Sequence, residues 1–160
     1  MDQPVRVLFL CRDNATRSQI AEGLLRVLGK EDFQVFSAGS APQALHPLAV
    51  AIMQESNVDS SQQRSKSVEA FAGEHFDFII VLRDEDANEP MPTLPGSSKP
   101  TLASWNYADP SAVESDDEAR RHAFRTLARD LRERISLWVN SQHNLLRERG
   151  STHVLTTSTE

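Results

Sequence analysis

The chemically informative residues of this chain lie around Cys11, the only cysteine among its 160 residues. Arg17 and Ser18 follow it at a Cys-x5-Arg-Ser spacing. A loop of this kind, placed before a helix, directs backbone N–H groups to one point and favours negative charge there. The same field lowers a thiol pKa from about 8.5 toward roughly 4–7. Because the Arg17 guanidinium matches two oxygens of an anion, the spacing predicts an oxyanion-binding loop with a nucleophilic thiolate.

The residues between Cys11 and the next helix have different expected roles. Asn14 tolerates a left-handed backbone, which a tight loop requires. Ser18 either donates its hydroxyl to the thiolate, which lowers the pKa of Cys11, or caps the helix. Asp13 opposes anion binding, because a carboxylate at ~6 Å costs about 3 kcal/mol at an effective dielectric of ~20. We therefore expect Asp13 to point outward, toward Arg12. The candidate oxyanion-binding residues are Arg12, Asp13, Asn14, Ala15, Thr16, Arg17 and Ser18.

Asp109, which precedes Pro110, is a candidate general acid. Displacement at phosphorus or arsenic leaves an oxyanion that needs a proton, and a carboxylic acid can supply it. Pro110 restricts Asp109 to an extended conformation, so its side chain is expected on a loop. Asp-Pro is also a common turn pair, and that reading stays open.

The elements that must position these residues alternate between strands and helices. Apolar runs predict strands at residues 5–10, 34–37, 76–82 and 101–105. Amphipathic segments predict helices at residues 18–30, from 47 onward, at 67–74 and at about 116–140. The alternation predicts an α/β three-layer sandwich, a four-stranded parallel sheet with helices on both faces. Ligands bind at the carboxyl ends of such strands, where Cys11 and Asp109 are expected. Residues 83–100 contain four prolines and predict a long functional loop.

Composition predicts one domain over residues 1–150 and a polar, disordered tail at 151–160. The net charge of -6 argues against a broad nucleic-acid or anionic-membrane surface. No apolar run is long enough to span a membrane, and a lone cysteine allows no internal disulfide, which fits a cytoplasmic location. The five histidines are scattered, and no Cys/His spacing predicts a bound metal.

The segment from Val7 to Glu22 closely resembles the opening of the low-molecular-weight tyrosine phosphatase superfamily, and within it the phosphatase-like arsenate reductases. The resemblance covers roughly residues 5–140, and it continues through Ser37-Ala-Gly39, His46-Pro47, Arg64-Ser-Lys66, Phe76-Asp77, Ser104-Trp105, Asp109-Pro110 and Ala123-Phe-Arg125. It implies that Cys11 is the nucleophile and that Arg17 and the loop amides bind the oxyanion. It also implies that Asp109 is the general acid.

Departures from the family pattern bear on the reductant and on cation binding. Arsenate reductases that use thioredoxin carry two further cysteines around the loop after the third strand, whereas residues 81–91 here contain none. The resemblance therefore implies an external thiol, glutathione or mycothiol with a glutaredoxin-like partner, and no bound cofactor. Some relatives bind potassium near the segment 64–66. Lys66 could supply that positive charge itself, so we expect no metal requirement.

Three functions remain open at this point. The first is a cytoplasmic arsenate reductase that uses Cys11 alone. The second is a phosphatase acting through a cysteinyl-phosphate, although the tyrosine phosphatases usually carry a second cysteine where this chain has Thr16 and aromatic residues where it has Ser111-Ala-Val113. The third is a non-catalytic oxyanion-binding module, for which Asp13 is the main argument.

Overall fold

The computed structural model describes residues 3–94, 96 and 99–156. Four strands form one parallel sheet in the order β2-β1-β3-β4. Their bounds are Val5–Cys11 for β1, Phe33–Gly39 for β2, Phe78–Arg83 for β3 and Thr101–Asn106 for β4. The three α-helices are α1 (Arg17–Gly29), α2 (Pro47–Glu55) and α3 (Asp117–Thr156), and short 3-10 helices are η1 (Lys30–Asp32), η2 (Val68–Phe71) and η3 (Pro110–Ala112).

The alternation of side chains along β1 places Cys11 on the helical side of the sheet. Val7, Phe9 and Cys11 share one core with α1, α2 and α3, while Leu8 and Leu10 belong to a second core on the opposite face. This is the period of two expected of a strand that is buried on both faces. Cys11 is the last residue of β1, so its thiol sits where the sheet ends and α1 approaches.

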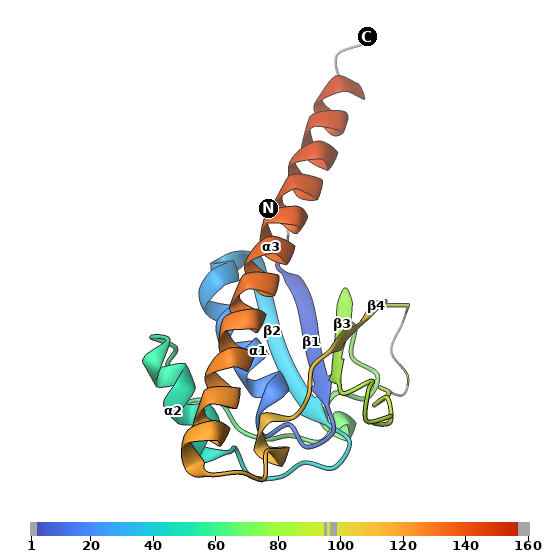
Figure 1. Cartoon of the computed structure of the whole chain (residues 1–160). Helices are drawn as coiled ribbons and strands as arrows, with labels where there is room; N and C mark the ends of the chain where they lie inside the picture. The colour runs from blue at the N-terminus through green and yellow to red at the C-terminus, as the bar shows by residue number, and fades with distance from the viewer. Residues whose placement is uncertain (1–2, 95, 97–98, 157–160) are drawn as a thin grey trace.

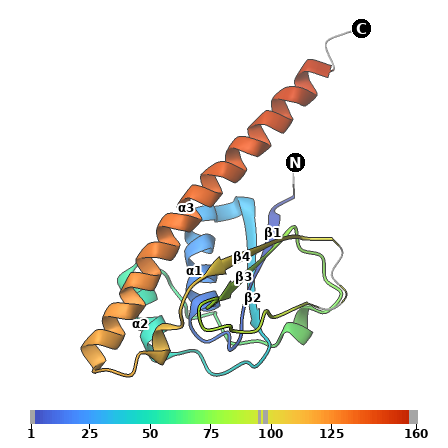
Figure 2. The ribbon, with the colours of Figure 1, turned by 45° about the vertical axis from the view of Figure 1, so that its right-hand side comes forward.

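The two faces of the sheet are covered unequally. All three α-helices lie on one side, and the other side is covered by η2 and its neighbouring segments, as Figure 2 shows. The predicted four-stranded parallel α/β sheet is therefore confirmed, but its second face carries only the 3-10 helix η2 in place of a full helical layer. That turn occupies part of the helix expected at 67–74.

The predicted end of the last helix is wrong. The apolar stripe suggested an end near Asn140, but α3 continues to Thr156 and projects beyond the sheet (Figure 1). Six residues of the tail expected to be disordered, 151–156, are therefore helical, while 157–160 lie outside the described residues. Apolar periodicity detects only the part of a helix that packs on a core, so the turns that project beyond the sheet escape it.

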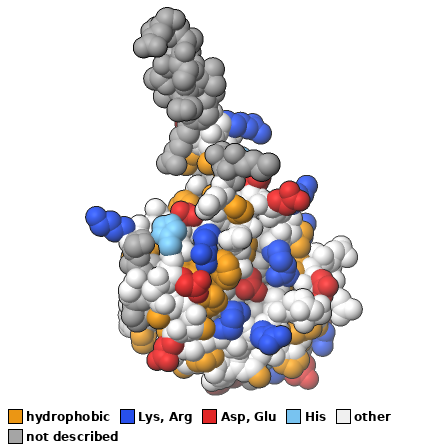
Figure 3. Space-filling model, turned by 180° about the vertical axis from the view of Figure 1, so that it is seen from behind, with side chains coloured by type: hydrophobic (Ala, Val, Ile, Leu, Met, Phe, Trp, Pro, Cys, Tyr) orange, Lys and Arg blue, Asp and Glu red, His pale blue; other side chains and the backbone are white. Residues whose placement is uncertain are grey.

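Acidic and basic side chains are interspersed on the face shown in Figure 3. Within the described ranges, no helix is both long enough and apolar enough to cross a membrane.

Candidate active site

The loop after β1 turns its backbone N–H groups inward. The carbonyl oxygens of Arg12, Asp13 and Ala15 accept hydrogen bonds from amides of the segment 41–46, at 2.7, 2.9 and 3.0 Å. In a trans peptide the N–H points opposite to the C=O. Since these carbonyls face the outer segment, the N–H groups of residues 13, 14 and 16 face the interior of the loop, as an anion-binding nest requires.

Two backbone features allow this tight loop. Asn14 has a φ of 50°, the left-handed conformation predicted for it. Gly39, which pairs with Cys11 in the sheet, passes so close that a Cβ there would lie 2.7 Å from the Arg12 oxygen and 2.9 Å from the Asn14 nitrogen. A side chain at position 39 would push the loop away from the strand, so the close approach requires glycine.

Ser18 is placed to donate to the Cys11 sulfur. Its Oγ lies 2.9 Å from Sγ and accepts a hydrogen bond from Asn14 Nδ2 at 2.7 Å. Because Asn14 is the donor to Ser18, the hydroxyl proton is free to point at Sγ. The backbone N–H of Asn14 also donates to Sγ, at 3.3 Å. Ser18 lies inside α1, after the N-cap residue Thr16, so its alternative role as a cap does not apply.

Asp13 contradicts the expectation that it points outward. Its side chain is only 8% exposed, and Oδ1 accepts the Ala15 N–H at 3.1 Å and lies 3.7 Å from Cys11 Sγ. It makes no approach to Arg12, which is exposed. The reason is that a short carboxylate side chain can accept the backbone N–H two residues further along the loop, and a buried N–H needs a partner. The carboxylate therefore lies inside the loop, beside the Cys11 sulfur.

The pKa of Cys11 is raised rather than lowered, and this corrects the sequence-based expectation. Burial of the thiol is the main cause, and the Asp13 charge acts in the same direction. The Ser18 hydroxyl and the Arg17 charge oppose it without prevailing. Burial explains the direction, since it disfavours the charged thiolate, and the nearby Asp13 carboxylate repels the thiolate as well.

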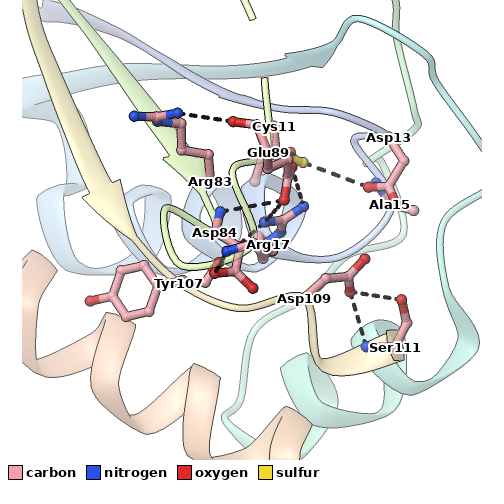
Figure 4. Close-up of polar contacts among 12 residues, drawn as sticks. Cys11, Asp13, Ala15, Arg17, Arg83, Asp84, Glu89, Tyr107, Asp109 and Ser111 are labelled. Carbon is pink, nitrogen blue, oxygen red and sulfur yellow. Dashed lines mark hydrogen bonds and ion pairs between the residues drawn. The ribbon is translucent and has the colours of Figure 1, made fainter. Parts of the chain in front are cut away.

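Arg17 is fully buried and is held by Glu89, a residue that the sequence alone did not single out. Glu89 Oε2 accepts from Nη1 at 2.9 Å and Oε1 accepts from Nη2 at 2.8 Å, and Nη1 also donates to the Tyr107 carbonyl at 3.1 Å (Figure 4). Glu89 lies in the predicted functional loop at 83–100, which was the one available signal. A buried arginine also requires a counter-charge, but the spacing could not say which carboxylate supplies it.

Asp109 lies at the same edge of the sheet, where Tyr107 of the preceding segment reaches Arg17. Its Oδ1 accepts from the backbone N–H and the hydroxyl of Ser111, at 2.9 and 2.7 Å (Figure 4). The backbone of Asp109 is extended before Pro110, as predicted. Oδ2 has no hydrogen-bond partner within the part of the chain that the structure describes.

Lys66 lies beside the loop, next to a buried carboxylate. Its Nζ is 3.9 Å from Glu22 Oε1, which also accepts from Ser37 Oγ at 3.2 Å. Burial raises the pKa of Glu22 and lowers that of Lys66. The Lys66 backbone N–H donates to Asn14 Oδ1 at 2.9 Å, which ties this pair to the loop. The Lys66 ammonium thus lies next to the Glu22 carboxylate, and its replacement of a bound cation stays a prediction.

The structure brings the predicted residues together at the carboxyl edge of the sheet. Cys11 and Ser18 form one contact group with Asp13 and Asn14. The Arg17 charge acts electrostatically on Cys11 and Asp109, and Asp109 enters from the segment after β4. Among the remaining loop residues, Ala15 and Thr16 are buried and contribute through the backbone, while the Arg12 side chain is exposed to solvent.

A buried cysteine at the end of a strand, with an amide-lined loop and a buried arginine after it, is the arrangement that the sequence predicts for a phosphatase-type site. The chain belongs to the low molecular weight phosphotyrosine protein phosphatase family, whose model matches residues 6–142.

Among characterised relatives, the glutaredoxin arsenate reductase of Synechocystis sp. is 32% identical over 130 residues, covering 81% of this chain and 92% of the relative. The arsenate reductase of Bacillus licheniformis is 32% identical over 129 residues, covering 81% and 91%. A solved arsenate reductase in the phosphate binding state superposes with a TM-score of 0.69 at 28% identity, covering 86% of this chain and 98% of that one.

Proposed function

We propose that this chain is an arsenate reductase that uses Cys11 as its only nucleophile and an external thiol as its reductant. The observation that carries this function is the grouping of the Cys11 sulfur, the inward-facing loop amides and Arg17, in a chain without a second cysteine. Relatives named as arsenate reductases support the choice of substrate.

The first step forms a bond between Cys11 Sγ and arsenic. The loop amides and Arg17 hold the arsenate, and Ser18 stabilises the thiolate by donating its hydroxyl proton. Because burial raises the pKa of Cys11, the thiol proton passes to the bound hydrogen arsenate dianion, which becomes the dihydrogen arsenate monoanion. As the S–As bond forms, one As–O bond breaks, and that oxygen leaves as water with a proton from Asp109. The product is a singly charged cysteinyl-arsenate adduct that still contains arsenic(V).

The second step transfers two electrons to arsenic. An external thiol attacks Cys11 Sγ, an S–S bond forms, and the S–As bond breaks with its electron pair on arsenic. Each sulfur loses one electron. Arsenite leaves with the electron pair and takes the thiol proton, which makes it the dihydrogen arsenite monoanion. A second thiol, on glutathione, mycothiol or a glutaredoxin-like protein, then attacks the mixed disulfide and regenerates Cys11. The reducing cytoplasm holds such thiols, and we place the protein there.

The same site can support phosphate-ester hydrolysis, in which water activated by Asp109 resolves a cysteinyl-phosphate. The family description favours this second candidate. The segment after Asp109 argues against an aryl substrate, because Ser111-Ala-Val113 offers no aromatic side chain to a ring. Phosphatase activity is therefore the alternative that the test must separate.

The test measures arsenite formed from arsenate with glutathione or mycothiol, with and without a glutaredoxin, beside hydrolysis of p-nitrophenyl phosphate without thiol. We expect thiol-dependent arsenite formation and a mixed disulfide on Cys11 by mass spectrometry. Aryl phosphate hydrolysis alone would replace this function with a phosphatase. Phosphate binding without turnover in either assay would leave only the non-catalytic module.

A further inference from the structure

Glu89 holds the outer edge of the Arg17 guanidinium. Its two oxygens accept one N–H each from Nη1 and Nη2, at 2.9 and 2.8 Å. Both side chains are buried, with exposed fractions of 0% for Arg17 and 8% for Glu89. A bidentate pair of this kind fixes the plane of the guanidinium as well as its position.

The N–H groups of Arg17 can be counted individually, since a guanidinium has five donors. Glu89 takes one from Nη1 and one from Nη2, and the Tyr107 carbonyl takes the second N–H of Nη1. Nε is buried and has no hydrogen-bond partner among the described residues. The two remaining donors are Nε–H and one N–H of Nη2, which are neighbours on a second edge of the group, called here the inner edge. They form a second fork that matches two oxygens of an anion.

The loop after β3 holds Glu89 in place. The Glu89 N–H donates to the Asp84 carbonyl at 3.1 Å, and the Asp84 N–H donates to Glu89 Oε2 at 3.3 Å. Arg83, the last residue of β3, donates from Nη1 to the Glu89 carbonyl at 2.9 Å. Both ends of the turn are thus tied to the residue whose side chain reaches Arg17, as the close-up in Figure 4 shows.

We propose that Glu89 is a positioning residue for oxyanion binding. It holds Arg17 by the Nη1/Nη2 edge and presents the Nε/Nη2 edge to a tetrahedral oxyanion above Cys11. A competing role, in which Glu89 blocks Arg17 until the anion displaces it, does not explain why a buried Nε stays unpaired among the described residues. This role rests on the oxyanion-binding function proposed above and adds a residue that acts through the arginine.

The test compares the dissociation constants of inorganic phosphate for Glu89→Gln and for the parent protein by calorimetry. The control is Asp86→Asn, which removes one negative charge from the same loop at an exposed position. We expect phosphate binding to weaken roughly 10- to 100-fold in Glu89→Gln, because the variant loses the charge-assisted hydrogen bonds that orient the Arg17 guanidinium. Phosphate affinity should change little in Asp86→Asn. Equal or tighter binding by Glu89→Gln would overturn the positioning role and favour the competitor.

A double-mutant cycle separates positioning from general destabilisation of the loop. In an Arg17→Lys background, Glu89→Gln should weaken phosphate binding no further, because its effect passes through the guanidinium. An additive loss would contradict the role. If Glu89→Gln is too unstable to purify, Glu89→Asp retains the charge with a shorter reach and should give an intermediate loss, whereas unchanged affinity would overturn the role. Phosphate binding is independent of arsenate turnover, so a failure of the reductase function remains distinguishable.

Discussion

The loops after β1 and after β3 each place one carboxylate at the candidate active site, and the two carboxylates take different donors. Asp13, on the first loop, accepts the N–H of Ala15, whose neighbouring loop amides face the anion position. Glu89, on the second, accepts from the outer edge of Arg17 and leaves the inner edge free. We therefore expect the Asp13 carboxylate to repel a bound oxyanion, and Glu89 to orient the Arg17 guanidinium that would bind it. Both have the same charge, so the donor that each one takes determines its effect.

Cys11→Ser should have the largest effect and should separate chemistry from binding. It removes the nucleophile, so thiol-dependent arsenite formation should fall below detection. The substitution is small and local, so the thermal unfolding midpoint should stay nearly unchanged and phosphate should still bind. Retention of full turnover would show that the nucleophile has been assigned incorrectly. In this inactive background the affinity effects of Asp13 and Glu89 can be compared without chemistry.

Asp109→Asn should come next, because an amide cannot supply the proton for the leaving oxygen. We expect single-turnover formation of the adduct to slow by about 10²–10⁴. Phosphate affinity should change little, in contrast to substitutions at either of the two compared carboxylates. Ser111→Ala is the matched control, because it removes a hydrogen bond that orients Asp109 but keeps the carboxyl group. We expect it to slow adduct formation less than Asp109→Asn does. An unchanged adduct rate in Asp109→Asn would remove Asp109 from the mechanism.

Asp13→Asn should move phosphate affinity in the direction opposite to Glu89→Gln. Removing a negative charge near the anion should tighten phosphate binding by roughly tenfold, since a like charge at ~6 Å costs about 3 kcal/mol before screening by solvent and salt. Calorimetry on both variants under identical ionic strength tests the contrast. Weaker binding in Asp13→Asn would mean that Asp13 helps to shape the loop, and the comparison would then fail.

The smallest expected effect concerns the pKa of Cys11, read from the pH dependence of alkylation. Burial raises this pKa, so the reaction midpoint should lie above the ordinary thiol value of about 8.5. Asp13→Asn should lower the midpoint and Ser18→Ala should raise it. Because the unfolded thiol ionises at lower pH, the stability contribution is complete below the ordinary value and is lost as pH rises through the raised one. A midpoint below about 8.5 in the parent protein would contradict this balance.

The binding loop itself was predictable from the sequence because its parts are neighbours. Cys11, Asn14 and Arg17 sit at fixed spacing between a buried strand and a helix, so type and order define the geometry. The direction of Asp13 was not predictable, since it depends on which buried backbone N–H of the folded loop the carboxylate accepts. Glu89 was missed because it is 72 residues from Arg17 and only the folded sheet brings the two together.

The 72-residue separation between Arg17 and Glu89 also affects how the protein loses activity. The residues of the loop after β1 are neighbours in the chain and are held by the segment 41–46 and by Lys66, but the Arg17 guanidinium is fixed only when the segment after β3 is docked. A surface loop such as the one after β3 opens at a lower free-energy cost than the strands at the centre of the sheet. We therefore expect oxyanion binding to be lost at a lower denaturant concentration than the helices. Protein that keeps all of its helical structure can then already be inactive.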